Sequence, residues 1–389
     1  MRPKILIVSL AYVPFVGGAE LALRDITDRV TECDFDLITY RFDRRWPPEE
    51  RIGNVRVFRV GFGSYSGSYY GRTLEKFLFI PLAFIKGFFL HRRNRYAVFW
   101  SLMASRASAP ALFLKFCFPR VPFFLTIQEG DTPEYAHKRA GFLLRLWRLV
   151  FRYADRTQVI SSYLRDFCVR EGADKDRIDI IPNGVDVSLF SKIFSDDDKQ
   201  TLLNQLGITK NAQVIVSASR LVPKNGIDVI LKAQRHLQKD GLGVTVLLLG
   251  TGPEEDMLRR YADAHSLSVV FAGDIKHEEL PRYFAVSDVF VRPSRSEGLG
   301  TAFLEAMAAG LPIIGTPVGG IVDFLRDGET GLFCEVKNPE SIAEKIKIYL
   351  GNKALTDKIK INARELVIKN YDWDLIAKRM EKIFEKVIV

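Results

Sequence analysis

The sequence predicts an α/β protein built from two doubly wound domains. The chain has 389 residues, 47% of them hydrophobic, which is enough apolar material for two cores. Short β-branched and aromatic runs alternate with helical patterns along most of the chain. Glycine-containing loops follow several of these runs, where the carboxyl ends of parallel strands would bind a ligand.

The first domain is expected at residues 1–182, beginning with the strand Lys4–Leu10. This stretch lacks the small-residue cleavage site of a signal peptide, so a strand is expected instead. Gly17 and Gly18 stand in the loop that follows, before a helix expected at Ala19–Val30. Further strands are expected at Phe35–Tyr40, Val55–Val60, Ala97–Trp100, Phe123–Thr126, Gln158–Ile160 and Asp179–Ile181.

Two helical stretches of the first domain combine apolar and basic residues. Phe77–Leu90 is almost wholly apolar and too short to span a bilayer, and a basic run follows it: His91, Arg92, Arg93 and Arg95. Gly141–Arg156 places an apolar stripe opposite three arginines, Arg145, Arg148 and Arg152. Such helices can lie in a membrane interface, or pack on the sheet with their arginines in solvent, and both interpretations stay open here.

The positive charge is concentrated in the first domain. Residues 1–182 hold 29 Lys/Arg and 19 Asp/Glu, about +10, whereas the rest of the chain is close to neutral. This imbalance indicates an anionic surface or ligand for the first domain, and by charge alone membrane lipid, nucleic acid and a phosphorylated acceptor all stay open. Peripheral contact with an anionic membrane is expected. Nucleic acid is not expected, because the chain has no long basic, Gly-rich tract and no zinc-ligand spacing. The four dispersed cysteines indicate a reducing compartment, so a cytoplasmic protein is expected, peripheral on the inner face of the membrane if it binds lipid.

The second domain is expected at residues 183–372, and its central feature is a strand, a loop and a helix in succession. The strand is expected at Val289–Val291 and the helix is expected to start at a capping Thr301. The N–H groups of four residues would point at a ligand from the positive end of this helix: Gly298, Leu299, Gly300 and Thr301. An anion site is therefore expected here.

Two carboxylates flank this anion site, Glu297 before the glycines and Glu305 within the helix. A carboxylate accepts two hydrogen bonds and therefore suits a vicinal diol, such as that of a ribose or a hexose. Arg220 and Lys224 follow another expected strand, Val214–Ala218, and together suit a diphosphate. A diphosphate flanked by two sugars would satisfy both features. Taken singly, Glu297 is more typical of a solvated loop acid and Glu305 of an ordinary first-turn acid, whereas the whole string favours the ligand site.

Carboxylates in this sequence leave two other functions open, glycosidase activity and metal binding. Glycosidases also use a pair of carboxylates, but they would need neither the phosphate cradle nor the Arg–Lys pair. Asp196, Asp197 and Asp198 form a run that could bind a metal, although a solvated turn in a linker is favoured. No metal and no other cofactor is expected.

Glu297 and Glu305, with seven residues between them, resemble the E-x7-E motif of retaining family-4 glycosyltransferases, which have the GT-B fold. The resemblance implies two doubly wound, Rossmann-like domains that face each other across a cleft. The surrounding Pro-Ser-Arg-Ser-Glu-Gly-Leu-Gly and Gly-Thr-Pro-Val-Gly-Gly are similar to the same family. The resemblance implies transfer of a sugar, with retained anomeric configuration, from a UDP- or GDP-sugar to a hydroxyl of a glycan or lipid-linked acceptor. Such an activity belongs to cell-surface polysaccharide or glycolipid synthesis.

The resemblance also implies roles for single residues. Glu305 would bind the ribose, and Glu297 the hydroxyls of the transferred sugar. Arg220 and Lys224 would stabilise the departing diphosphate. The donor would also be contacted by Gly17, Gly18 and, beside the base, Ile275. The helix at 373–389 would pack back on the first domain.

The sequence departs from the family at two positions. The family places a lysine directly before the glycine that opens a helix, where this chain has Asn225, so the role is assigned to the preceding Lys224. Gln128 stands where many relatives have a histidine, and Gln128 and Glu129 are the acceptor-side candidates. A nucleotide-sugar-binding protein without turnover is the alternative; replacement of Glu297 or Arg220 would favour it, and neither is replaced.

Overall fold

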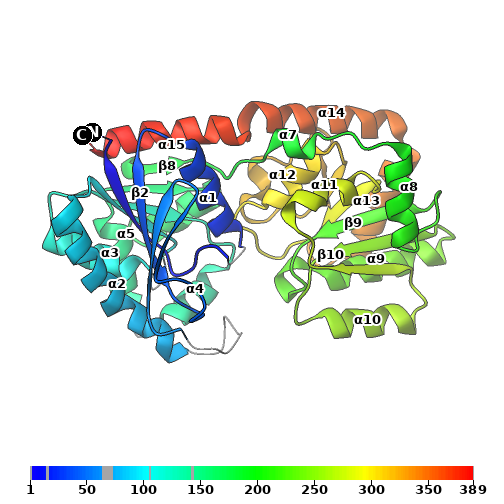
Figure 1. Cartoon of the computed structure of the whole chain (residues 1–389). Coiled ribbons are helices and arrows are strands. Elements are labelled where there is room, and N and C mark those ends of the chain that lie inside the picture. Colours follow the sequence, from blue (N-terminus) through cyan, green and yellow to red (C-terminus); the bar gives the residue numbers. More distant parts are fainter. Residues whose placement is uncertain (1, 15–16, 64–72, 105–106, 142–143, 389) are drawn as a thin grey trace. The chain divides into compact units, whose positions relative to one another are not determined.

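The computed structural model describes residues 2–14, 17–63, 73–104, 107–141 and 144–388, which form two compact units (Figure 1). Unit 1 comprises Met1–Asn183 and Trp373–Val389, and unit 2 comprises Gly184–Asp372. Each unit is built on a largely parallel sheet with helices packed against it. The expected α/β fold class with two parallel-sheet domains is confirmed.

Unit 1 contains an eight-stranded sheet in the order β3-β4-β2-β1-β5-β6-β7-β8. All neighbouring strands are parallel except β3 and β4. The strands are β1 (Lys4–Val8), β2 (Asp34–Tyr40), β3 (Glu49–Ile52), β4 (Val55–Val60), β5 (Val98–Leu102), β6 (Phe123–Ile127), β7 (Arg156–Val159) and β8 (Ile178–Ile180).

The helices of unit 1 connect these strands, and one of them comes from the end of the chain. They are α1 (Gly18–Arg29), α2 (Thr73–Asn94), α3 (Ser108–Cys117), α4 (Pro133–Ala140), α5 (Leu144–Tyr153), α6 (Ser162–Arg170) and α15 (Trp373–Ile388), with a short 3₁₀ turn η2 (Lys175–Arg177). The apolar face of α15 is part of the same core as β1, β2 and β5. The last helix therefore completes unit 1.

The apolar stripe of α5 packs inside unit 1. Trp147, Val150 and Phe151 are buried, and the Trp147 indole donates a hydrogen bond of 2.6 Å to the Ala104 carbonyl oxygen. On the other face, Arg148 pairs with Glu171 at 3.1 Å. The burial of these three side chains favours the interpretation in which this helix packs on the sheet of unit 1. Phe142 and Leu143 of the expected helix lie outside the described residues.

Unit 2 contains a six-stranded parallel sheet in the order β11-β10-β9-β12-β13-β14. The strands are β9 (Gln213–Ala218), β10 (Val244–Leu249), β11 (Val269–Gly273), β12 (Val289–Arg292), β13 (Ile313–Gly315) and β14 (Leu332–Phe333). The helices are α7 (Val187–Phe190), α8 (Asp196–Gln205), α9 (Ile227–Lys239), α10 (Glu255–Ala264), α11 (Leu280–Phe284), α12 (Thr301–Ala308), α13 (Pro339–Gly351) and α14 (Lys353–Asn370). The 3₁₀ turns are η3 (Pro223–Asn225), η4 (His277–Glu279) and η5 (Gly319–Asp323).

The strand order of unit 2 reverses between β9 and β12. The chain continues from β9 to β10 on one side, whereas β12 joins β9 on the other side, pairing Val289 with Ile215 and Phe290 with Val216. The loops that leave two such strands diverge to opposite faces of the sheet and leave a crevice between them. Arg220 follows β9 and Glu297 follows β12, so both stand at this edge.

Two local features differ from those expected from the sequence. The charged segment Glu49–Ile52 forms the edge strand β3, paired antiparallel with β4. The Asp196–Asp198 run is the first turn of α8 and not a linker turn, and Ser195 forms a capping box with Asp198. Carboxylates at a helix N-terminus are stabilised by the helix dipole, which accounts for the run without a metal.

Candidate active site

The segment after β9 carries the predicted cations of unit 2. Arg220 is exposed directly beyond the strand, and Lys224 is half-buried in η3. The neighbouring Asn225 is buried, and its side-chain amide donates to the Arg220 carbonyl oxygen at 2.7 Å. Position 225 therefore points inward and braces the Arg220 segment, while Lys224 lies closer to the surface.

The loop after β12 is buried and ends at the N-terminus of α12. Gly300 is the N-cap, with φ of 92°, a left-handed conformation that favours glycine. Thr301 is the first helical residue, so the expectation that Thr301 caps the helix is wrong, and no side chain caps it. The first N–H groups of a helix have no intrahelical partner, which leaves those of Thr301 and its neighbours available to an anion.

Gly319 and Gly320 of η5 pack against the backbone of this loop. The Gly320 N–H donates to the Glu297 carbonyl oxygen at 3.2 Å. Gly319 has φ of 56°, and a Cβ added there would lie 1.8 Å from the same oxygen. Only glycine allows η5 to approach the backbone of Glu297 so closely.

Glu297 is buried and its carboxylate is held on both oxygens. It is 9% exposed. Oε1 accepts a hydrogen bond of 3.2 Å from the Gly298 N–H. Oε2 forms an ion pair with Arg292, the last residue of β12. Each carboxylate oxygen has a second lone pair, so Glu297 can still accept hydrogen bonds from hydroxyl groups.

Glu305 lies in the second turn of α12 and is 8% exposed. Its Oε1 is 2.8 Å from Nε2 of His277, which opens η4 two residues after Ile275. The His277 ring packs against Phe190, with ring centroids 5.4 Å apart. Glu305, the second predicted carboxylate, is thus a buried acceptor that His277 holds in place. Ile275, predicted to lie beside the base, is two residues before His277 in the sequence.

Several buried hydroxyls gather at the same edge of the sheet. In the described part of the chain, the Oγ atoms of Ser217, Ser219 and Ser294 are buried without a hydrogen-bond partner. Ser217 lies near the end of β9, Ser219 directly follows that strand, and Ser294 follows β12. Buried polar atoms are normally paired, so this group indicates a place where a polar ligand completes the hydrogen bonding.

The predicted residues of unit 1 lie at the carboxyl edge of its own sheet. Gly17 and Gly18 precede and open α1, and the Glu20 carboxylate turns back so that a Cβ on Gly17 would lie 2.3 Å from Oε2. Burial raises the pKa of the Glu20 carboxyl above its ordinary value. Gln128 follows β6, accepts a hydrogen bond of 3.1 Å from Asn183, and keeps a buried Nε2 that has no partner among the described residues. Glu129 is buried.

The structure adds three residues that the sequence did not assign to the site, Asn225, Arg292 and His277. Arg292 carried a usable signal, because a charged residue that ends an otherwise apolar buried strand requires a partner. His277 carried none, since its contact with Glu305 joins residues 28 positions apart. Within the described residues, no group of three or more His, Cys, Asp or Glu could hold a metal ion.

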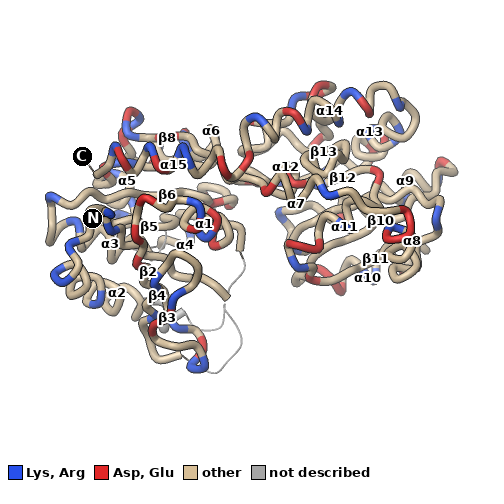
Figure 2. Tube along the Cα trace, turned by 45° about the horizontal axis from the view of Figure 1, so that its top comes forward, with Lys and Arg blue, Asp and Glu red and all other residues tan. Residues whose placement is uncertain are grey.

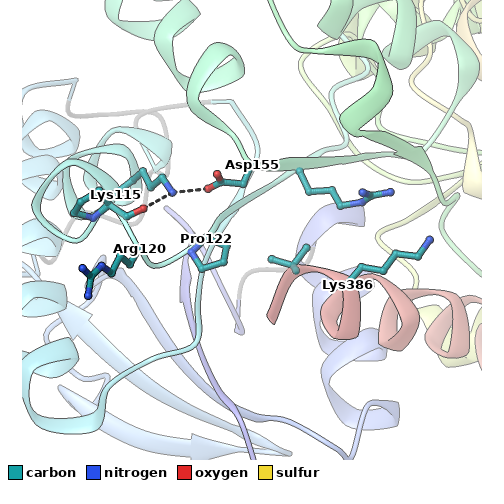
Figure 3. Close-up of a pocket in the computed structure, with 8 residues that line it drawn as sticks. Lys115, Arg120, Pro122, Asp155 and Lys386 are labelled. Atoms are coloured by element: carbon teal, nitrogen blue, oxygen red, sulfur yellow. Dashed lines mark hydrogen bonds and ion pairs between the residues drawn. The ribbon is translucent and has the colours of Figure 1, made fainter. Parts of the chain in front are cut away.

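A further pocket, of about 260 Å³, lies at the opposite, amino edge of the unit 1 sheet (Figure 3). Four cations line it, but two are neutralised. Lys115 pairs with Asp155 at 2.8 Å, and Arg156 pairs with Asp179. Arg120 and Lys386 point in opposite directions in Figure 3. The side chains that line this pocket therefore do not direct their positive charge at a common point.

Two family models match the chain and together cover most of it. Residues 198–366 match the glycosyl transferases group 1, and residues 17–184 match a glycosyl transferase 4-like domain. An uncharacterized glycosyltransferase of Methanocaldococcus jannaschii is 25% identical over 98% of both chains. A GDP-mannose-dependent α-(1-6)-phosphatidylinositol monomannoside mannosyltransferase of Mycobacterium tuberculosis is 28% identical, over 63% of this chain and 66% of its own.

Solved structures share the fold over the full length. Sucrose-phosphate synthase from Thermosynechococcus elongatus superposes with a TM-score of 0.83 at 21% identity, covering 100% of this chain and 99% of the other. Anabaena HepE in complex with UDP-glucose gives 0.79 at 21% identity, covering 98% and 99%. With two parallel-sheet domains, both halves matched by family models and the E-x7-E pair at the β9–β12 edge, the chain belongs to the family-4 type glycosyltransferases of GT-B fold.

Proposed function

We propose that this protein is a retaining glycosyltransferase that moves a sugar from a UDP- or GDP-sugar to a hydroxyl of a glycan or lipid-linked acceptor. One observation carries the proposal. Two buried carboxylates, Glu297 and Glu305, stand beside a helix N-terminus at the edge where the strand order reverses. This arrangement suits a ligand with a diphosphate between two diol-bearing sugars.

Each residue then has a role in transfer. Glu305, fixed by His277, accepts hydrogen bonds from the ribose, and Glu297 accepts them from the transferred sugar. Arg220, Lys224 and the N–H groups at the start of α12 stabilise the diphosphate as its charge grows in the transition state. The departing phosphate oxygen takes the proton of the acceptor hydroxyl on the same face. Transfer on that face retains the anomeric configuration.

The choice between the two nucleotides stays open. The mycobacterial relative is named for GDP-mannose, whereas HepE was solved with UDP-glucose. Gln128, with its unpartnered Nε2, and the buried Glu129 are proposed to meet the acceptor. No metal is proposed.

Unit 1 is proposed to contact an anionic membrane from the cytoplasmic side. No helix in the described part of the chain combines the length and apolarity needed to cross a bilayer. The α2–α3 surface, defined as Ile85, Phe89, Phe116, Arg92 and Arg93, nevertheless exposes large apolar side chains beside arginines: Ile85 is 51%, Phe89 66% and Phe116 48% exposed. Lys and Arg lie along α2 and α3 with few acidic residues (Figure 2). Such a surface suits anionic lipid.

The proposal is tested by incubating the purified protein with a panel of UDP- and GDP-sugars and candidate acceptors. One donor should release its nucleotide in an acceptor-dependent manner, and NMR should show retained configuration in the product. Activity should persist in excess EDTA, because protein cations supply the charge. A protein that binds a nucleotide sugar but transfers nothing would be a binding protein, and activity restored only by magnesium or manganese would overturn the cation assignment.

A further inference from the structure

We infer that Arg292 is a positioning residue for transfer, which fixes Glu297 and supplies the positive charge on the inner side of the donor site. The inference rests on the proposed function. Arg292 ends β12 and its side chain is only 11% exposed. Its Nη2 binds the Glu297 carboxylate and lies 3.3 Å from Oδ1 of Asn225. Its guanidinium carbon lies 5.9 Å from the centroid of the Phe303 ring.

These contacts join the three segments that carry the site. Asn225 belongs to η3 after β9, Glu297 to the loop after β12, and Phe303 to α12. One guanidinium therefore links the segment of Arg220 to the carboxylate and to the helix whose N-terminus faces the ligand. The Asn225 amide faces both ways, since it donates to the Arg220 carbonyl oxygen and accepts from Arg292.

The charge of Arg292 makes Glu297 compatible with a diphosphate. A buried carboxylate next to a leaving group that gains negative charge would repel it. The ion pair with Arg292 cancels that repulsion and leaves the second lone pair of each Glu297 oxygen for a sugar hydroxyl. Arg292 thus adds a cation from the end of β12 to those proposed at Arg220 and Lys224.

The geometry favours an arginine. Both contacts come from one nitrogen, Nη2, whose two N–H groups donate to Asn225 and Glu297. A lysine would supply the charge and several donors, but its ammonium ends one bond earlier along the side chain and lacks the planar group that faces the Phe303 ring. The Nε of Arg292 is buried and has no partner among the described residues, so the side chain is held through Nη2 and the ring of Phe303.

The test compares Arg292→Met and Arg292→Lys with a matched variant, Arg295→Met. Arg295 lies in the same loop and pairs with Asp228 at 2.7 Å. For each variant, kcat and KM for the nucleotide sugar are measured, together with the affinity for the free nucleoside diphosphate by calorimetry. Free nucleoside diphosphate lacks the transferred sugar that Glu297 is proposed to hold, so its affinity separates positioning from general damage.

Arg292→Met should lower kcat on the order of 100-fold, the cost of misplacing a reacting group. Its affinity for the free nucleoside diphosphate should change by less than about threefold. Arg292→Lys should recover part of kcat and should serve as the test if Arg292→Met does not fold. Arg295→Met should lower the melting temperature and keep kcat within about threefold of the wild type.

Wild-type kcat in Arg292→Met would overturn the inference. So would equal losses of kcat and nucleotide affinity in Arg292→Met and Arg295→Met, because they would show a structural role only. A wild-type protein that binds a nucleotide sugar but transfers nothing would instead overturn the proposed function. In that case the affinity for nucleotide sugar relative to free nucleotide still tests Arg292, and an unchanged ratio in Arg292→Met would refute it.

Discussion

At the residue scale, burial changes what Glu305 contributes. From the sequence, Glu305 resembles a surface acid near a helix start, whose loss would cost little stability. The structure places it in the second turn, 8% exposed and 2.8 Å from His277. A buried carboxylate that already has one partner is held in place before the ligand binds. Little conformational entropy of the Glu305 side chain is therefore lost when a diol binds to it.

Glu305→Ala is expected to weaken binding of the nucleoside diphosphate by about 1–3 kcal/mol, since the ribose hydroxyls lose their acceptor. Glu344→Ala, which removes an exposed acid on α13, is the control and should not change the affinity. Calorimetric titration of both variants measures the difference. Unchanged affinity in Glu305→Ala would contradict the assignment of Glu305 to the ribose.

At the element scale, the loop between β12 and α12 depends on η5 behind it. The Gly320 N–H and the positive φ of Gly319 bring η5 against the Glu297 backbone. The position of Glu297 therefore depends on η5, a segment more than twenty residues further along the chain. This is why two glycines that touch no ligand matter to the site.

Gly319→Ala is expected to displace the Glu297 loop, because the new Cβ would lie 1.8 Å from a backbone oxygen and φ is 56°. The melting temperature and kcat should both fall, with a stability cost of about 1–3 kcal/mol. Gly351→Ala is the matched control, since a Cβ there meets nothing within 4 Å. Thermal unfolding and transfer assays on the two variants decide; equal behaviour would show that η5 does not support the loop.

The α2–α3 surface sets the expectation for membrane contact at the same scale. Wild-type protein should float with anionic vesicles at low salt and detach at high salt, because screening acts over about 8–10 Å. Phe89→Asp with Arg92→Gln and Arg93→Gln should weaken flotation, by up to roughly 1 kcal/mol per arginine. Arg145→Gln with Arg148→Gln should not, because α5 buries its apolar stripe. Flotation that depends on the α5 pair and not on α2 would reverse this expectation.

At the scale of the whole molecule, the chain returns to unit 1 after completing unit 2. Phe384 of α15 packs against Phe35, Trp100 and Phe124, with ring centroids 6.1, 5.2 and 5.7 Å apart. The core of unit 1 therefore includes residues that follow unit 2 in the sequence. The buried core of unit 2 uses none of them.

Phe384→Ala is expected to destabilise unit 1 by about 3–5 kcal/mol, the usual cost of removing a buried aromatic ring. Unit 2 should keep its protection, since its core is separate. Hydrogen exchange of peptides from β5 and β9 measures the two units independently. The exposed Phe116 provides a control, because Phe116→Ala removes the same side chain at little cost to either core.

The sequence by itself determined the fold class and the family. The β-branched and aromatic runs placed most strands within one or two residues, as at Phe123–Thr126 and Val214–Ala218, because buried parallel strands need nearly continuous apolar sequence. The short, charged edge strand β3 was beyond this reasoning, since only pairing with β4 makes Glu49–Ile52 a strand. The spacing of Glu297 and Glu305 gave the candidate site, whose individual roles remain predictions.

Only the tertiary structure decided which side chains these carboxylates meet. Arg292 and Asn225 are 67 residues apart, and His277 and Glu305 are 28 apart, so neither pair follows from local pattern. The same holds for α5, whose stripe looks equally suited to a membrane or to a core until Ala104 and Glu171 are seen beside it. Periodicity shows that a face is apolar, whereas the partner that covers it is set by long-range packing.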